Sequence, residues 1–278
     1  MKAKGIEKVL VTGGAGFIGS HTTDLLIKLG YHVTVLDNLE AQVHGERGKP
    51  PDYINKDAAF LHGDIRDRKL LKKTIQEVDA IIHLAAMVGV GQSMYQMERY
   101  VDVNTKGTAN LLDVLVNEEN VVKKLIVASS MSIYGEGKYR CEKCSTNVYP
   151  ELRNEIQLKK QQWDHLCPTC NSPLTPLPTD EEKPLAPTSI YALTKRHQEE
   201  MCLLIGQTYG IPTVALRYFN VYGSRQALSN PYTGCAAIFT SRILNDKHPY
   251  IFEDGNQTRD FIHVKAVSYT HLRAHETV

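Results

Sequence analysis

Short apolar runs alternate with longer stretches of mixed apolar and polar residues over the first two thirds of the chain. The short runs are rich in β-branched residues, which is typical of buried strands. The predicted strands are Val9–Thr12, His32–Leu36, Ala59–His62, Ala80–Leu84, Lys124–Ala128 and Thr213–Arg217. The longer stretches are amphipathic and favour helices. The predicted helices are Ile18–Leu29, Asp67–Val78, Met94–Asn117 and Ser189–Tyr209.

This alternation of strands and helices predicts an α/β fold with a parallel, doubly wound sheet. The alternation stops between Glu136 and Pro187, where the chain holds four cysteines, many prolines and a polar middle. We therefore expect an insertion at this place.

A glycine-rich loop, Gly13 to Gly19, follows the first predicted strand and opens the first predicted helix. Gly13 suits a tight turn, Gly16 lets the backbone approach a diphosphate, and Gly19 lets the helix pack closely on the sheet. The helix N-terminus favours the negative charge of that diphosphate. Asp37 ends the second strand, where its carboxylate would accept from a ribose diol and repel a 2′-phosphate, so NAD is predicted rather than NADP. The alternative is a glycine turn without a ligand.

Three side chains form the candidate catalytic set. Tyr191 and Lys195 are spaced i and i+4 on a predicted helix, so they share one face. A lysine charge and a nicotinamide cation both favour tyrosinate, which can take a proton from a sugar hydroxyl. Ser130 follows the strand Lys124–Ala128, at the sheet edge where functional groups gather, and can hydrogen-bond the same oxygen. Taken alone, the tyrosine–lysine spacing is also typical of a solvated helix face.

Two CxxC pairs, Cys141–Cys144 and Cys167–Cys170, are separated by 22 residues within the insertion. This spacing is typical of a zinc ribbon, in which four thiolates complete a tetrahedral shell. We therefore predict a structural zinc that supplies folding energy, in a ribbon that borders the substrate entrance. The alternatives are a redox dithiol or idle thiols. His165 is not needed as a ligand, and the isolated Cys202 and Cys235 are expected in the core.

The charge balance argues against several classes of partner. Lys and Arg total 32 and Asp and Glu total 31, a formal net charge of +1, so nucleic-acid binding is not expected. No apolar run reaches about 18 residues, so no membrane span is expected. The chain goes directly into the strand-like Lys8–Val11 without a signal peptide, and a cytoplasmic protein with reduced or metal-bound cysteines is expected.

Together and in this order, the motifs of the chain resemble those of the extended short-chain dehydrogenase/reductases, in the sugar-nucleotide epimerase/dehydratase group with its Rossmann-type fold. The similarity covers nearly the whole chain to Val264. The matching motifs are TGGAGFIGS at 12–20, Asp37-Asn38, GDIRD at 63–67, HLAA at 83–86, VNTKGT at 103–108, SSMSIYG at 129–135, YALTK at 191–195, LRYFNVYG at 216–223 and RDFIHV at 259–264.

The resemblance implies a role for each matched position. It implies that the catalytic residues are Ser130, Tyr191 and Lys195. The residues implied to bind NAD are Gly13, Gly16, Phe17, Ile18, Gly19, Asp37, Asn38, Asp64, Ile65, Leu84, Ala85, Ala86, Asn104, Tyr191, Lys195 and Tyr218. Those implied to bind a nucleotide-sugar substrate are Ser130, Asn220 and Arg259. From the residues alone, Asp64 could equally cap the turn at Ile65–Arg66.

Met131 and Ser132 narrow the reaction that the resemblance implies. The 4,6-dehydratases of the family carry an Asp-Glu pair there, so this chain lacks the acid and base that eliminate water. An NAD-dependent nucleotide-sugar 4-epimerase, an isomerase, is therefore predicted. The segments 43–45, 88–104, 129–137 and 225–234 are most similar to epimerases described as acting on dTDP-L-rhamnose. UDP-glucose/UDP-galactose 4-epimerase, a reductase or decarboxylase of a nucleotide keto sugar, and a non-enzymatic Rossmann sensor or scaffold are the alternatives.

The end of the chain departs from the family pattern. Beyond Val264 the family continues with acidic residues and a helix, whereas the run Val267–Thr277 resembles the translation of a sequencing adapter. We therefore leave this run out of the fold prediction as an artefact. No metal or phosphate site is assigned to His271, Arg273 or His275. A divergent natural C-terminus is the alternative; on the adapter interpretation, poor solubility and little turnover are expected.

The predicted helices Met94–Asn117 and Ser189–Tyr209 carry apolar residues on more than one face. Burial within one chain would explain this, but the family resemblance implies a homodimer joined by a four-helix bundle. The predicted organisation is an NAD-binding Rossmann domain at 1–135, the zinc-ribbon-like insertion at 136–187, the Rossmann domain continued at 188–217, a small, truncated substrate domain at 218–265 and the adapter-like tail at 266–278.

Overall fold

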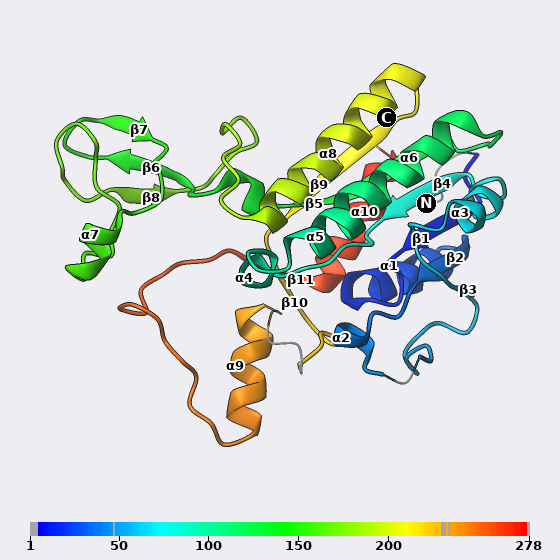
Figure 1. Cartoon of the computed structure of the whole chain (residues 1–278), viewed down its shortest axis with the longest axis horizontal. Helices are drawn as coiled ribbons and strands as arrows, with labels where there is room; N and C mark the ends of the chain where they lie inside the picture. The colour runs from blue at the N-terminus through cyan, green and yellow to red at the C-terminus, as the bar shows by residue number, and fades with distance from the viewer. Residues whose placement is uncertain (1–4, 47, 229–231, 233, 277–278) are drawn as a thin grey trace.

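A parallel sheet runs through the centre of the computed structural model, which describes residues 5–46, 48–228, 232 and 234–276 (Figure 1). Its strand order is β3-β2-β1-β4-β5-β9, and each neighbouring pair is parallel. The strands are β1 Lys8–Thr12, β2 His32–Asp37, β3 Ala59–His62, β4 Ala80–His83, β5 Lys124–Ser130 and β9 Thr213–Tyr218. The predicted parallel, doubly wound sheet is therefore confirmed.

Helices cover both faces of this sheet because the strand side chains alternate between two apolar cores. Leu10 and Ile81 belong to the core under α3, α6 and α8, whereas Val9 and Ile82 belong to the core under α1 and α10. These helices are α1 Phe17–Lys28, α3 Arg68–Ile75, α6 Gly107–Asn117, α8 Ile190–Tyr209 and α10 Val264–Glu276. None of the helices in the described part of the chain has both the length and the apolar character needed to cross a bilayer.

The helix predicted over Met94–Asn117 is not continuous. The structure has, in order, α4 Val90–Ser93, α5 Met97–Tyr100, a π-helical segment Val101–Lys106, and α6. The π-helical segment carries Asn104, which is fully buried and bonds Met87 and Thr194. Apolar periodicity does not distinguish a π-helical turn from an α-helical one, so this interruption has no clear signal in the sequence.

The insertion forms its own antiparallel sheet at one end of the molecule (Figure 1). Its elements are β6 Lys138–Cys141, β7 Thr146–Val148, α7 Glu155–Lys159 and β8 Thr175–Leu177, with strand order β7-β6-β8. A small core gathers its cysteines around Leu174. The Arg153 guanidinium donates two hydrogen bonds, of 2.9 and 2.8 Å, to the carboxylate of Glu253. The insertion is therefore tied to the segment 245–260.

The remaining elements lie beside the carboxyl edge of the central sheet. They are α2 Ala41–His44, a 3₁₀ turn Met131–Tyr134, β10 Asn220–Tyr222, α9 Cys235–Leu244 and β11 Phe261–His263. Cys202 is buried in the core, as predicted. Cys235 is exposed, so the prediction for it is wrong; it starts α9, which buries only Ala237 among its residues.

The adapter-like run forms part of α10, which packs along α1. Val267, His271 and Leu272 are buried there. Leaving this run out of the fold was therefore wrong for the structure, because its apolar residues recur at helical spacing and cover the sheet face beside α1. The adapter origin of the run stays a prediction.

Candidate active site

A large cavity lies at the carboxyl edge of the sheet, where the order of the strands reverses between β1 and β4. Its volume is about 640 Å³, which suits a sizeable small molecule. The predicted site residues that line it are Gly13, Gly16, Phe17, Ile18, Gly19, Asp37, Asn38, Asp64, Ile65, Leu84, Ala85, Ala86, Ser130, Tyr191, Lys195, Tyr218 and Asn220. The structure thus brings together residues from both ends of the chain.

The glycine loop has the shape that close approach of a ligand requires. Gly13 has a φ of +69°, and a Cβ there would lie 2.8 Å from the backbone nitrogen of Ala85. A Cβ on Gly19 would overlap the carbonyl oxygen of Gly13, so α1 can approach the loop only with glycine there. Gly16 caps α1 without a side-chain hydrogen bond. The first amides of α1 therefore face the cavity, and the helix dipole favours an anion there.

The Asp37 carboxylate is buried beside this loop and is held by two backbone amides. Its oxygens accept from the N–H groups of Ala15 and Leu39, each at 2.9 Å. The His44 imidazole lies 3.8 Å away, and burial lowers the pKa of His44 despite the nearby carboxylate. The Asp37 carboxyl group is therefore held in one place on the cavity wall, a position that suits a ribose diol and leaves no room for a 2′-phosphate.

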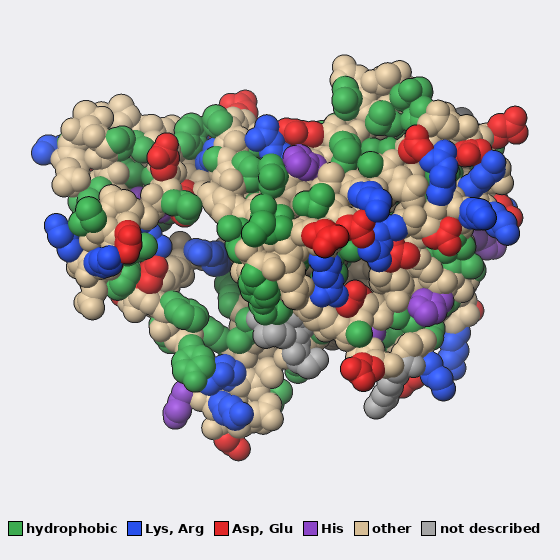
Figure 2. All heavy atoms as spheres, in the orientation of Figure 1, with side chains coloured by type: hydrophobic (Ala, Val, Ile, Leu, Met, Phe, Trp, Pro, Cys, Tyr) green, Lys and Arg blue, Asp and Glu red, His purple; other side chains and the backbone are tan. Residues whose placement is uncertain are grey.

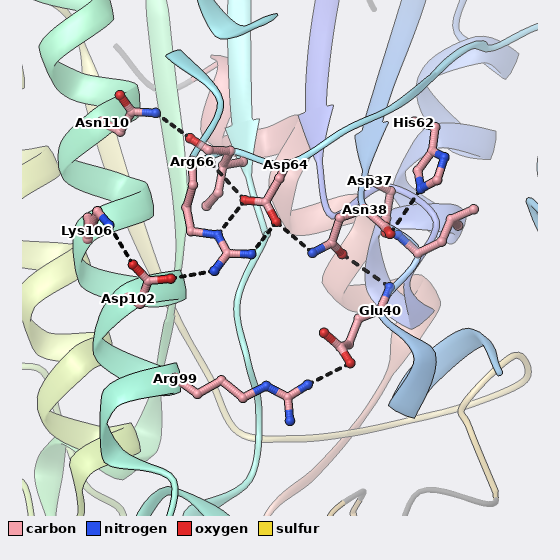
Figure 3. Close-up of polar contacts among 12 residues, drawn as sticks. Asp37, Asn38, Glu40, His62, Asp64, Arg66, Arg99, Asp102, Lys106 and Asn110 are labelled. Atoms are coloured by element: carbon pink, nitrogen blue, oxygen red, sulfur yellow. Dashed lines mark hydrogen bonds and ion pairs between the residues drawn. The ribbon is translucent and has the colours of Figure 1, made fainter. Parts of the chain in front are cut away.

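Asp64 belongs to a network of charged side chains on the same side of the cavity (Figure 3). Its carboxylate accepts from Asn38 at 2.9 Å and from the Arg66 guanidinium at 2.7 and 2.8 Å. Arg66 also pairs with Asp102. These bonds, chiefly those from Arg66, lower the pKa of Asp64 to about 2. Asp64 also accepts from the backbone N–H of Arg66 at 2.9 Å, so it is both a cavity wall and a turn cap.

Several residues that line or brace the cavity were missed by the sequence analysis. Arg99 donates to Glu40 at 2.7 Å and so ties α5 to α2 (Figure 3). The Tyr53 hydroxyl donates to the carbonyl of Ala15 at 3.0 Å, and the Arg225 guanidinium stacks over the Tyr53 ring at 5.2 Å. Each contact joins positions far apart in the sequence, so no local spacing signals it.

Ser130 and Tyr191 line the other end of the cavity, where the Ser130 side chain is close enough to affect the pKa of Tyr191. Ser130 ends β5, and its Oγ accepts from the hydroxyl of Ser132 at 2.8 Å. Burial raises the pKa of Tyr191, and the nearby Ser130 side chain offsets this only in part. Lys195 is not among the causes of this shift, so the structure gives no sign of the predicted lowering of the Tyr191 pKa by Lys195.

Lys195 lies one turn after Tyr191 in the same wall. Its Nζ donates to Oε1 of Gln198 at 2.8 Å. Burial lowers the pKa of Lys195 to about 8, so the ammonium is still charged at neutral pH. Tyr191 and Lys195 are 9% and 3% exposed, so the alternative of a solvated helix face is wrong.

Two of the predicted ligand contacts do not line the cavity. Asn104 lies behind the wall, where its Oδ1 accepts from the backbone N–H of Met87 at 2.7 Å. It braces the wall because the π-helical turn directs its side chain inward. Arg259 is exposed, because the segment 245–260 runs out toward the insertion (Figure 1). Asn220 does line the cavity.

The predicted zinc ligands come together in the insertion. The Sγ atoms that lie within 4.8 Å of one another belong to Cys141, Cys144, Cys167 and Cys170. Thiolates at about 2.3 Å from a tetrahedral zinc stand about 3.8 Å apart. Cys141 and Cys170 are 3.5 Å apart, and Cys144 and Cys167 are 3.9 Å apart. His165 instead pairs with Glu136 at 3.0 Å, so the donor set is four sulfur atoms.

Comparison with known proteins agrees with this geometry. The sequence model of the NAD dependent epimerase/dehydratase family matches residues 9–173 and 169–278. The chain belongs to this family. The resemblance predicted from the motifs is therefore confirmed.

Relatives in the family include 4-epimerases of different nucleotide sugars. The dTDP-L-rhamnose 4-epimerase of Burkholderia thailandensis is 36% identical over 264 residues, 94% of this chain and 71% of the relative. The putative UDP-glucose 4-epimerase of Methanocaldococcus jannaschii is also 36% identical, over 267 residues, 96% of this chain and 72% of the relative.

Solved structures give the same result. The UDP-N-acetylglucosamine 4-epimerase of Methanobrevibacter ruminantium, in complex with UDP-N-acetylmuramic acid, has a TM-score of 0.75 and 32% identity, covering 98% of this chain and 73% of that one. The UDP-glucuronic acid 4-epimerase of Bacillus cereus, in complex with UDP-glucuronic acid and NAD, has a TM-score of 0.74 and 29% identity, covering 97% and 73%.

The Asp64–Arg66 pair should stabilise the fold in a pH-dependent way. Because the pKa of Asp64 is lowered on folding, its contribution should be fully present above about pH 5 and lost as the pH falls toward 2. Arg66 is half-exposed, so we expect a coupling energy of about 1 kcal/mol at pH 7. Urea unfolding of Asp64→Asn, Arg66→Gln and the double variant measures it.

The exposed pair Arg68–Asp113 serves as the matched control and should couple more weakly in the same double-mutant cycle. Equal coupling in the two pairs, or a coupling for Asp64–Arg66 that does not decline below pH 4, would contradict the interpretation.

Proposed function

We propose that this chain is an NAD-dependent nucleotide-sugar 4-epimerase, an isomerase that oxidises and re-reduces C4 of its substrate. One observation carries the proposal. Ser130, Tyr191 and Lys195 line one end of a cavity whose other end holds the glycine loop and Asp37. A cofactor that extends along this cavity would bring its reactive ring to these side chains.

The residues present fit NAD. Gly13 and Gly19 occupy places that a Cβ would fill, and the uncapped start of α1 offers amides to a diphosphate. Asp37 would hold the adenosine ribose, and Asn38 with Asp64 and Ile65 would border the adenine. When bound, NAD would supply a hydride acceptor that later returns the hydride to C4.

The chain's own residues would manage the proton. Tyr191 would take the proton of the C4 hydroxyl as the hydride leaves, and would return it when the hydride comes back to the other face. Ser130 would hydrogen-bond the same oxygen in both states. Lys195, charged below a pKa of about 8, would favour the tyrosinate and hold the nicotinamide ribose. No net oxidation results from this cycle.

Met131 and Ser132 support epimerisation over loss of water. A thioether and a hydroxyl supply neither the general acid nor the general base that elimination across C5 and C6 needs. Rotation of the keto sugar between the two hydride transfers needs no further group. The site therefore has what a 4-epimerase requires.

For the substrate we propose dTDP-L-rhamnose. The support is the similarity in the segments 43–45, 88–104, 129–137 and 225–234. A UDP-hexose such as UDP-glucose or UDP-galactose is the alternative, because a relative described by that substrate has the same identity to this chain.

The test is a product assay with dTDP-L-rhamnose and no added cofactor. We expect the C4 epimer, detected by NMR or chromatography, because the cofactor is regenerated in each turnover. Tyr191→Phe should lose at least about 100-fold in kcat, as expected for removal of a general base, and should keep bound NAD. If product forms only when NADPH or NADH is supplied, the result would instead support a keto-sugar reductase. If product forms from UDP-glucose and not from dTDP-L-rhamnose, UDP-glucose would replace dTDP-L-rhamnose as the proposed substrate.

We also propose a structural zinc ion in the insertion. Two of the sulfur pairs stand 3.5 and 3.9 Å apart, near the separation in a tetrahedral thiolate site, and all four sulfur atoms lie within 4.8 Å of one another. Four thiolates would leave no open ligand position for catalysis. The small core around Leu174 offers little apolar burial of its own, so metal binding would supply much of its folding energy. Thiolates kept ready for zinc agree with the reducing cytoplasm expected for this chain.

The purified protein should therefore carry about one zinc ion per chain by mass spectrometry of the metal. Cys144→Ser and Cys170→Ser should lose the zinc and lower the melting temperature, because each removes one of the four ligands. Cys235→Ser, at an exposed cysteine outside the cluster, is the control and should change neither quantity. A stable protein that contains a Cys141–Cys170 disulfide and no metal would overturn the proposal.

A homodimer through a four-helix bundle is proposed for the same chain. Exposed apolar side chains gather over α4, α5 and α8 on one face (Figure 2). They include Met94, Met97, Val101, Leu193, Leu203 and Leu204. Contiguous apolar surface of this kind marks association sites, and pairing each helix with its copy would bury it.

The double variant Met97→Glu with Leu204→Glu should be monomeric in light scattering, since four charges would then meet at the dimer axis. Ile156→Glu is the matched control, because Ile156 is 69% exposed on α7, away from this face. A monomeric wild-type protein at micromolar concentration, or a dimer that survives the double variant, would refute the bundle.

A further inference from the structure

A buried row of polar side chains connects the strand before the glycine loop to the catalytic lysine. Its members come from β1, β4, α6 and α8, and each is 3% exposed or less. They are Thr12, His83, Thr108, Gln198 and Lys195. Successive members are joined by contacts of 2.8 Å. Buried polar groups are costly unless each finds a partner, so the direction of every bond matters.

The proton positions in this row follow from one carbonyl group. The Thr108 hydroxyl donates to the carbonyl oxygen of Asn104 at 2.7 Å, and a carbonyl can only accept. Thr108 must therefore accept from its other partners, so Nε2 of His83 carries the proton. Burial lowers the pKa of His83 to about 3, so the ring is neutral and its Nδ1 accepts from Thr12.

The same argument sets the orientation of the Gln198 amide. Thr108 has donated its single proton, so it is the NH₂ group of Gln198 that lies 2.8 Å from it. The contact of 3.3 Å between this NH₂ group and Nε2 of His83 joins two donors and is packing rather than a hydrogen bond. The amide oxygen therefore faces the other way, toward Nζ of Lys195.

Lys195 gains a fixed acceptor from this arrangement. In the part of the chain that the structure describes, the buried ammonium of Lys195 donates to Oε1 of Gln198 at 2.8 Å. An ammonium has three donors, so two N–H groups are left for the cavity that Lys195 lines. The three-residue spacing of Lys195 and Gln198 on α8 puts both side chains on one helix face.

We propose that Gln198 is a positioning residue for the epimerase reaction: it anchors Nζ of Lys195 so that the other two N–H groups point at the ribose diol of the cofactor. The inference rests on the role proposed above for Lys195. Gln198 itself touches neither substrate nor cofactor. His83, Thr108 and Thr12 hold its amide in the required orientation. The row therefore fixes the position of the Lys195 ammonium relative to β1 and β4.

If Gln198 only filled a buried space, the substitutions described next would have a different effect. Gln198→Leu keeps the volume and removes the acceptor, whereas Gln198→Glu keeps an acceptor for Lys195. Gln207→Leu is the matched control, since Gln207 is exposed on the same helix. Folding is checked for each by circular dichroism and melting temperature.

The first readout is cofactor binding, measured as the Kd for NAD by titration calorimetry on protein stripped of nucleotide. Gln198→Leu should weaken NAD by about tenfold or more, the effect of one lost hydrogen bond to a charged group. Gln198→Glu should stay within about threefold of the wild type, because the acceptor remains. Equal affinity in Gln198→Leu and Gln207→Leu would overturn the proposal.

The second readout is the basic limb of the kcat–pH profile. The charged or titratable groups that face Lys195 come from two elements. They are Glu199, Cys202 and Tyr191 on α8 and the neutral His83 on β4. Losing the acceptor disfavours the ammonium, so Gln198→Leu should move the basic limb to lower pH, and Gln198→Glu should move it to higher pH. KM for the nucleotide sugar should not change. If Gln198→Leu does not fold, an unmoved limb in Gln198→Glu is sufficient to refute the proposal.

Failure of the proposed function would look different. Lys195→Met should weaken NAD at least as much as Gln198→Leu does. If Lys195→Met binds NAD as the wild type does, then the role of Lys195 itself is wrong. If only Gln198→Leu binds normally, the function stands and the positioning role falls.

Discussion

The parallel pairing of β1 with β4 is the constraint on which the rest of this structure depends. From this pair, β2 and β3 extend the sheet on one side, and β5 and β9 extend it on the other. The connecting helices therefore cover opposite faces and leave a crevice at the carboxyl edge. The register places Thr12 opposite His83 at the end of the pair. The glycine loop leaves β1 at that point, and Ala85 closes against Gly13 from the β4 side. A side chain at position 13 would therefore disturb both the loop and the crevice.

The seam also explains why polar side chains are buried in the middle of an apolar fold. Thr12 and His83 end their strands just inside the crevice, where an apolar side chain at position 12 would leave the N–H of Ala85 and the ring of His83 without this partner. Thr12 accepts from the N–H of Ala85 at 3.3 Å and donates to His83. Because the Asn104 carbonyl fixes the direction of the bonds along the row, the row gives one rigid arrangement. Rigidity at this place fixes the distance between the cofactor loop and α8.

Features with a local spacing could be predicted from the sequence. The strands follow from short β-branched runs, the glycine loop from its three glycines, and the cluster of four cysteines from two CxxC pairs. Tyr191 and Lys195 share a wall because positions four apart share a helix face. In each case the signal is a short run of neighbouring residues or a fixed spacing along the chain.

Features that depend on the path of the chain could not be predicted in this way. Asn104 lies behind the cavity wall because a π-helical turn redirects it, and Arg259 is exposed because the segment 245–260 runs toward the insertion. Gln198 matches no motif, and its role appears only when Thr108 and His83 arrive from other elements. The pKa of Tyr191 depends on its burial, which a spacing of four residues does not report.

Burial has opposite effects on the pKa values of the two candidate catalytic groups, Tyr191 and Lys195. It lowers the pKa of Lys195 to about 8 and raises that of Tyr191, because both charged forms lose solvation. Tyr191 would therefore lose its proton only while the pocket holds compensating positive charge. It holds a proton most tightly once positive charge has been cancelled, which is the state after a hydride has left the sugar. In the proposed reaction, proton transfer and hydride transfer would thus be favoured to occur together.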